Sequence, residues 1–340
     1  MCIAKLSVDR VELAKGSYST RLVQLGEAAG LTRHEVHPQP GDVLLARVTE
    51  VGEHRYLERP DGRLANLFDD DEVLLCYGEH EQAQVPDDLG PCQLVAAGGV
   101  AARTEREGTK ARTSLVPLGL LVDEEGQVLN LRRWAMRMPV PYPSRPVTLV
   151  ITGTGAGTGK TSAAAALIRG LNKAGFQVGA AKVTGTGMGV ETWVMRDAGA
   201  KTVLDMTDAG LASTYRASLP TLVRTFELLV AQLAATGVGV VVVELAEGIP
   251  QAETGALLAT PDFAHCVDGV LVAAHDAVGA GSGVARLRTW DLPVIGVTGR
   301  LTRSTATAGQ AAQLTDLPVL TLADLRGPET AGSLAKPLAR

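Results

Sequence analysis

The chain has 340 residues, of which 46% are hydrophobic and 20% charged. This length and composition leave room for two domains with buried cores and exclude an intrinsically disordered protein. The formal net charge is -5 with no basic cluster, so we expect no nucleic-acid partner. Without a long apolar run or a signal-peptide pattern, the sequence predicts a cytoplasmic protein with no membrane partner. Its four cysteines are widely spaced, which excludes a classical cysteine zinc site and gives no case for a disulfide framework.

The first part of the chain, residues 1–138, consists of short apolar segments separated by turn residues. Pro60-Asp61-Gly62 is one such turn, because proline and glycine supply the dihedral angles that tight turns need. The segments with the β-branched, apolar character of strands are residues 42–51, 73–76, 94–97 and 118–122. This pattern predicts a small β-rich, barrel-like N-terminal domain.

Residues 139–146 contain four prolines, of which Pro139, Pro141 and Pro143 alternate with other residues. Each proline removes a backbone donor and restricts the residue before it, so this stretch cannot form a helix. We therefore expect a proline-rich linker here, followed by a second domain over residues 147–340.

Apolar strands alternate with helical segments in the second part of the chain. The predicted strands are residues 147–152, 177–182, 238–244, 269–274 and 293–297. Residues 218–235 predict an amphipathic helix that Ser218 caps, with Pro220 in its first turn. Strands that alternate with helices indicate a mostly parallel α/β sheet that is covered on both faces.

A glycine-rich loop, residues 153–161 (GTGAGTGKT), separates the first of these strands from an alanine-rich helix. This order is typical of a P-loop, because glycines let backbone N–H groups point at phosphates and the helix N-terminus adds partial positive charge. Lys160 is placed to reach the outer phosphates, and the Thr161 hydroxyl to bind Mg²⁺. The residues expected to contact the nucleotide are Gly155, Ala156, Gly157, Thr158, Gly159, Lys160, Thr161 and Ser162.

These residues resemble the P-loop of dethiobiotin synthetase and its relatives, a SIMIBI-type family of P-loop NTPases. An N-terminal domain in front of such a domain resembles an uncharacterised two-domain family. The resemblance implies that Lys182, in Ala181-Lys182-Val183, helps to bind phosphates and substrate, and that Glu244 binds Mg²⁺. It also implies ATP as the nucleotide and a homodimer. The base-pocket asparagine of that family is absent from Gly296-Val297-Thr298-Gly299-Arg300.

Other acidic residues at the expected ligand edge leave alternatives open. Glu247 lies three residues after Glu244 and competes with it as a metal ligand. Asp205 and Asp208 follow another short apolar strand. They could hold Mg²⁺, serve as general base toward an acceptor hydroxyl, or simply form a turn and a helix cap. The glycine-rich residues 185–189 are equally consistent with contacts to an acceptor and with a mobile lid.

The sequence thus predicts a Mg²⁺- and ATP-dependent phosphotransferase that acts on a hydroxyl of a small, nucleoside- or sugar-like metabolite. Lys160 and Lys182 would neutralise the transferred group, Thr161 and Glu244 or Glu247 would hold the metal, and Asp205 or Asp208 would accept the proton. One alternative is a ligase that activates a carboxylate through an acyl phosphate. Another is a regulatory NTPase switch or metallochaperone.

Overall fold

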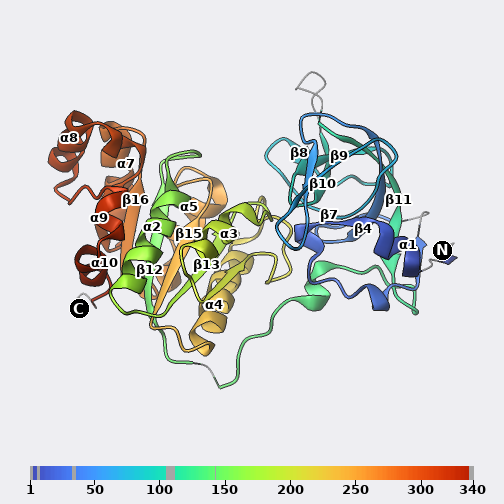
Figure 1. Cartoon of the computed structure of the whole chain (residues 1–340), viewed down its shortest axis with the longest axis horizontal. Coiled ribbons are helices and arrows are strands. Elements are labelled where there is room, and N and C mark those ends of the chain that lie inside the picture. Colours follow the sequence, from blue (N-terminus) through green and yellow to red (C-terminus); the bar gives the residue numbers. More distant parts are fainter. Residues whose placement is uncertain (1–2, 6–7, 33–35, 105–111, 142, 337–340) are drawn as a thin grey trace. The chain divides into compact units, whose positions relative to one another are not determined.

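The structure, a computed structural model, describes residues 3–5, 8–32, 36–104, 112–141 and 143–336 (Figure 1). The chain divides into two compact units. The β-rich unit consists of residues 1–136, 186–190 and 206–216, and the α/β unit of residues 137–185, 191–205 and 217–340. The predicted boundaries at 138 and 147 stay predictions; the β-rich unit also takes in residues 186–190 and 206–216, which come from the second part of the chain.

Five strands of the β-rich unit pair in a closed ring, which agrees with part of the barrel-like prediction. They are, in pairing order, β4 (Val43–Glu50), β7 (Glu72–Tyr77), β10 (Val100–Thr104), β9 (Cys92–Ala96) and β11 (Ser114–Val122), which pairs with β4 again. Along β4, Leu44, Ala46 and Val48 enter one buried cluster while Val43 and Leu45 enter another, as the alternation of strand side chains dictates. The first half of β4, residues 43–46, is therefore buried on both faces.

Shorter elements complete this unit. The strands are β1 (Ile3–Lys5), β2 (Lys15–Gly16), β3 (Gly30–Thr32), β5 (Tyr56–Glu58), β6 (Leu64–Asn66) and β8 (Ala83–Gln84). The helical turns are α1 (Val8–Leu13), η1 (Tyr18–Thr20), η2 (Leu25–Glu27) and η3 (Leu131–Trp134). The turn predicted at Pro60-Asp61-Gly62 joins β5 to β6, so this part of the sequence prediction is confirmed.

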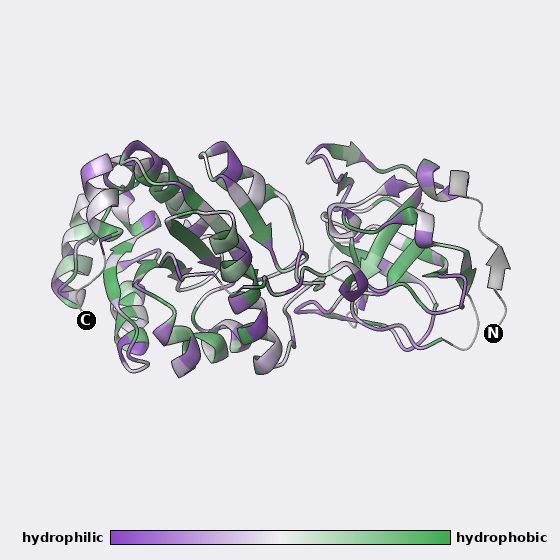
Figure 2. Ribbon diagram, turned by 90° about the horizontal axis from the view of Figure 1, so that it is seen from below, coloured by the Kyte–Doolittle hydropathy of each residue, from purple (hydrophilic) through white to green (hydrophobic). Residues whose placement is uncertain are grey.

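The α/β unit is built on a six-stranded parallel sheet of order β14-β13-β15-β12-β16-β17. Its strands are β12 (Val147–Gly153), β13 (Val178–Thr184), β14 (Thr202–Asp205), β15 (Val240–Leu245), β16 (Gly269–Ala273) and β17 (Val294–Thr298). The five predicted strands are confirmed to within a few residues. The strands of this sheet are mainly hydrophobic (Figure 2), as expected for a parallel sheet that is buried on both faces.

Helices alternate with these strands along the chain, as the sequence pattern predicts. They are α2 (Lys160–Lys173), α3 (Val190–Asp197), α4 (Leu219–Ala235), α5 (Ala252–Leu258), α6 (Pro261–His265), α7 (Ala277–Arg288), η4 (Arg300–Arg303), α8 (Thr305–Thr315), α9 (Leu322–Arg326) and α10 (Pro328–Leu334). The Ser218 side chain caps α4 by accepting from the Thr221 N–H, which confirms the predicted start of that helix.

The alternation of side chains along β15 decides what its last residues face. Val240 and Val242 pack in the same buried cluster as Leu167 of α2. Glu244 continues this alternation, so its carboxylate lies on the α2 side of the sheet, at the end where α2 begins. Within the described part of the chain, no helix is both long and apolar enough to cross a membrane.

Candidate functional site

The loop between β12 and α2 has the backbone geometry of a phosphate-binding loop. Gly157 and Gly159 have φ values of 67° and 102°, in the left-handed region that favours glycine. A Cβ atom on Gly153 would lie 2.6 Å from Thr158 Oγ1, so the loop closes on itself too tightly for a side chain there. Positions 155 and 157, in contrast, have nothing within 4 Å of where a Cβ would stand. The loop is packed at its start and open where a ligand would approach.

Lys160 is the first residue of α2 and is buried beside this loop. Its Nζ donates a hydrogen bond of 2.8 Å to the Gly155 carbonyl oxygen, across the mouth of the loop. Burial lowers the pKa of Lys160, although the carboxylates of Glu244 and Glu247 oppose this change. A phosphate in the loop would replace that carbonyl as the partner of the ammonium group.

Thr161 and Glu244 meet on the α2 side of the sheet. The Thr161 hydroxyl donates a hydrogen bond of 2.8 Å to Glu244 Oε1, and only 2% of Glu244 is exposed. Glu244 Oε2 is buried and has no hydrogen-bond partner within the described residues. Burial raises the pKa of Glu244, opposed by Lys182, by the Thr161 hydrogen bond and by Lys160. A buried carboxylate oxygen that lacks a donor fits a cation beside the Thr161 hydroxyl.

A row of charged residues crosses three neighbouring strands at their carboxyl ends. Lys182 of β13 pairs in register with Asp205 of β14 on one side and with Glu244 of β15 on the other. All three side chains are buried. Lys182 Nζ also lies 2.9 Å from Glu191 Oε2, at the start of α3. Burial alone would lower the pKa of Lys182, but Glu191, Glu244 and Asp205 outweigh it and raise this pKa.

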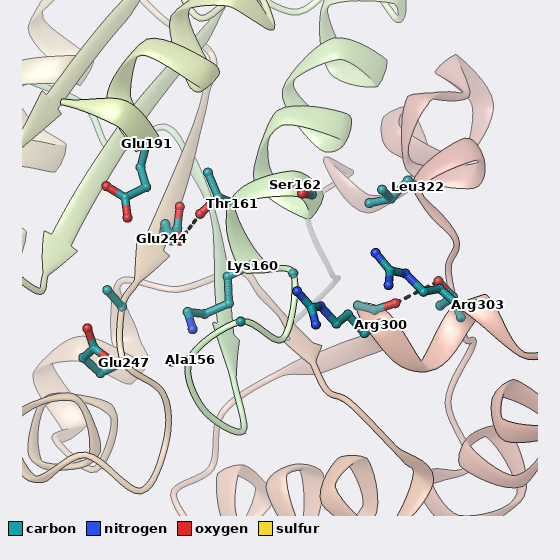
Figure 3. A pocket seen from close by; sticks show the side chains of 15 residues that line it. Ala156, Lys160, Thr161, Ser162, Glu191, Glu244, Glu247, Arg300, Arg303 and Leu322 are labelled. Atoms are coloured by element: carbon teal, nitrogen blue, oxygen red, sulfur yellow. Dashed lines mark hydrogen bonds between the residues drawn. The ribbon is translucent and has the colours of Figure 1, made fainter. Parts of the chain in front are cut away.

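A pocket of about 400 Å³ opens beside the loop. Figure 3 shows Glu191, Glu244 and Glu247 on one side of it and Arg300 and Arg303 on the other, with the phosphate loop between them. The pocket therefore has an acidic end, where β15 and α3 meet, and a basic end on η4.

The structure brings most of the predicted site residues to this pocket. Those that line it are Ala156, Gly157, Gly159, Lys160, Thr161, Ser162, Glu244 and Glu247. Thr158 is buried and donates a hydrogen bond of 3.1 Å to the Gly155 carbonyl oxygen, so both residues hold the shape of the loop. Lys182 and Asp205 lie behind the lining, in the buried row.

Asp208 is placed differently from the other predicted acids. It belongs to the β-rich unit, where its carboxylate lies 2.8 Å from the Arg21 guanidinium. Arg21 also donates a hydrogen bond to the Thr207 hydroxyl. Asp208 is thus engaged in a structural ion pair and is not among the residues that line the pocket.

Sequence reasoning missed several lining residues: Glu191, Thr302, Arg303 and Leu322. Glu191 had one detectable signal: it is an acidic residue in the first turn of a helix that follows a glycine-rich loop, where the helix N-terminus stabilises a negative charge. The other three come from the segments after β17 and had no local motif. Among the described residues, no cluster of three or more His, Cys, Asp or Glu side chains could hold a metal ion.

Comparisons with known proteins extend this description only in part. No family model matches the chain, and no curated protein matches it. The resemblance to dethiobiotin synthetase therefore stays a prediction, as does the likeness of the whole chain to a two-domain family.

Solved structures match 60% of this chain at TM-scores of 0.37 to 0.38. One is the 54 kDa signal recognition particle protein of Aeropyrum pernix in complex with GDP, at 20% identity; the match covers 51% of that chain. The others are the receptor FtsY of Elizabethkingia anophelis in complex with GDP, at 13% identity over 68% of that chain, and FtsY of Thermotoga maritima, at 15% over 74%. This chain thus spans about half the length of the first of these proteins. The parallel sheet, the glycine loop and α2 themselves define a P-loop nucleotide-binding fold.

Proposed function

We propose that the α/β unit binds Mg²⁺ and a nucleoside triphosphate and transfers the terminal phosphoryl group to a hydroxyl of a small metabolite. One observation carries the proposal: Lys160, Thr161 and Glu244, from two different elements, converge on the pocket beside the phosphate loop. The resemblance described above supplies ATP as the default nucleotide.

Phosphoryl transfer needs positioned phosphates and neutralised charge more than covalent help from the protein. The open backbone at Gly155 and Gly157 and the N-terminus of α2 offer N–H groups for phosphate oxygens. Lys160 supplies a mobile positive charge once it leaves the Gly155 carbonyl. Lys182 supplies a second one from the buried row, provided that Glu191 releases it.

The residues around Glu244 fit a magnesium ion. Thr161 and Glu244 would hold it, because Mg²⁺ prefers oxygen ligands and completes its shell with phosphate and water oxygens. Glu247 lines the same end of the pocket and is exposed, so it could contact the ion through water. When bound, the ion would supply charge neutralisation at the phosphates.

Asp205 is the better candidate for general base, because Asp208 pairs with Arg21 in the β-rich unit. Asp205 is buried, and it pairs in register with Lys182 of the neighbouring strand. To act as the base, its carboxylate would have to face the acceptor hydroxyl in the occupied site. A homodimer remains part of the proposal only through the resemblance, and sedimentation of the active protein would test it.

A regulatory NTPase switch is the second candidate, and the ion pair between Lys182 and Glu191 favours it. The pair joins the phosphate edge of β13 to the first turn of α3. A terminal phosphate that draws Lys182 away from Glu191 would release α3, and hydrolysis would restore the pair. Such a state-dependent helix is what a switch requires.

The experiment that tests the proposal is incubation of a metabolite extract with the full chain, Mg²⁺ and γ-labelled nucleoside triphosphate, read by mass spectrometry. A labelled small molecule establishes a kinase, whereas labelled phosphate with an unlabelled condensed product indicates the ligase. Labelled phosphate alone supports the switch. Lys160→Ala should abolish every one of these products, and Lys173→Ala, at the exposed end of the same helix, should leave them unchanged.

A further inference from the structure

Two arginines form the basic end of the pocket. Arg300 and Arg303 are the first and last residues of η4, a 3₁₀ helix. Because such a helix has three residues per turn, side chains three apart project from the same side. Both arginines are exposed and line the pocket, and Leu322 of α9 adds an apolar wall beside them (Figure 3).

The backbone of η4 is fixed to the phosphate loop. The Arg300 N–H donates a hydrogen bond of 2.9 Å to the Thr158 carbonyl oxygen, and the Leu301 N–H donates one of 3.0 Å to Ala274. Gly299 has a φ of 99°, and a Cβ atom there would lie 2.5 Å from the Thr158 carbonyl oxygen. The two arginine side chains therefore start from a fixed place relative to the phosphate loop.

Neither guanidinium has a protein partner within the described part of the chain, whether a carboxylate or another hydrogen-bond acceptor. An arginine side chain has donors only. The acidic residues of the pocket lie at its opposite end, so this end offers donors to whatever part of the ligand extends past the phosphates.

We infer that Arg300 and Arg303 select a 6-oxopurine nucleotide, one that carries guanine or hypoxanthine, over an adenine nucleotide. The O6 and N7 atoms of a 6-oxopurine are adjacent acceptors that match the two donors of a guanidinium fork. Adenine presents an N6 amino donor beside N7, which would face a second donor. Leu322, which lines the pocket, supplies an apolar surface for the ring. This inference rests on the proposed function and replaces ATP, its default nucleotide.

The test is calorimetric titration of the full chain, in Mg²⁺, with GTP, ITP and ATP. GTP and ITP should bind at least about tenfold more tightly than ATP, which corresponds to ~1.4 kcal/mol. ITP separates the O6–N7 edge from the additional amino group of guanine. The double variant R300Q/R303Q should lose this preference, while Arg224→Gln, an exposed arginine of α4 outside the pocket, should keep it.

Several results would overturn the inference. One is that ATP binds as tightly as GTP or more tightly. Another is that the preference for GTP survives in R300Q/R303Q. A third is that a 3′-phosphorylated ATP binds more tightly than GTP, which would assign the arginines to a phosphate. Inorganic triphosphate distinguishes this failure from failure of the proposed function. If it binds wild type and double variant alike, the variant is folded and the site is real. If no triphosphate binds the wild type, both proposals fail.

Discussion

Glu191→Gln tests whether Lys182 depends on a single carboxylate for its place in the buried row. The ion pair has a 2.9 Å separation, with 4% of the Lys182 side chain and 28% of the Glu191 side chain exposed. Glutamine keeps the shape of the side chain and removes the charge. Lys182 is then left buried with Glu244 and Asp205 as its remaining counter-charges.

Loss of one partner of a fully buried ion pair costs about 3–5 kcal/mol. Because Glu191 is partly exposed and two carboxylates remain, we expect a loss of about 1–3 kcal/mol in the free energy of unfolding at pH 7. The pKa of Lys182 is raised above its usual 10.5 in the folded protein. The stabilisation from its charge is therefore fully present below pH 10.5 and is lost as the pH rises through the folded-state pKa, so pH 7 reports the whole effect.

The assay is urea unfolding of the full chain, followed by far-UV circular dichroism, with and without Mg²⁺ and nucleoside triphosphate. In Glu191→Gln, the nucleotide should add more stability than in the wild type, because a phosphate supplies the anion that Lys182 has lost. Glu329→Gln, which also removes an acid from the first turn of a helix, controls for the helix dipole. Equal losses in the two variants, or a smaller gain from nucleotide in Glu191→Gln, would refute this reasoning.

Three further predictions concern single positions. Burial raises the pKa of Glu244, so the free energy of unfolding of the wild type should fall as the pH rises through that pKa. Over the same pH range, and without Mg²⁺, Glu244→Gln should become more stable relative to the wild type. In the β-rich unit, a Cβ on Gly98 would lie 2.0 Å from the Gly187 carbonyl oxygen. Gly98→Ala should therefore lower the free energy of unfolding, measured in urea, by about 1–3 kcal/mol. Gly26→Ala, with open space around it, should lower it by less than about 0.5 kcal/mol. Ser218→Ala removes the cap of α4 and should cost about 1 kcal/mol; an unchanged unfolding midpoint would show that the cap contributes nothing.

Local patterns were sufficient to predict much of the α/β unit. The apolar strands, the cap at Ser218 and the glycine loop each depend on neighbours within a few residues, so the sequence reveals them directly. The alternation along β15 also explains why Glu244 faces Thr161, although the two residues are 83 positions apart. The closed order of the β-rich ring, in contrast, depends on pairing between distant strands and has no local signal.

The parts of the site that escaped prediction come from long-range contacts. Asp208 resembles a catalytic acid in the sequence, but its partner Arg21 lies far away in the chain, in the same compact unit. Arg303 and Leu322 reach the pocket only because η4 and α9 follow the last strand of the sheet. Glu191 pairs with Lys182 across a glycine-rich turn whose path no periodicity specifies.

The central claim is that the pocket beside the phosphate loop binds a nucleoside triphosphate through Lys160. It is tested most directly by titrating the full chain with GTP and with ATP in Mg²⁺, for wild type, Lys160→Ala and Lys173→Ala. The account predicts measurable binding to the wild type and to Lys173→Ala, and affinity weaker by about 10- to 100-fold in Lys160→Ala, as expected for loss of a charge-assisted hydrogen bond. Equal affinity of wild type and Lys160→Ala, or no binding of either nucleotide, would contradict it.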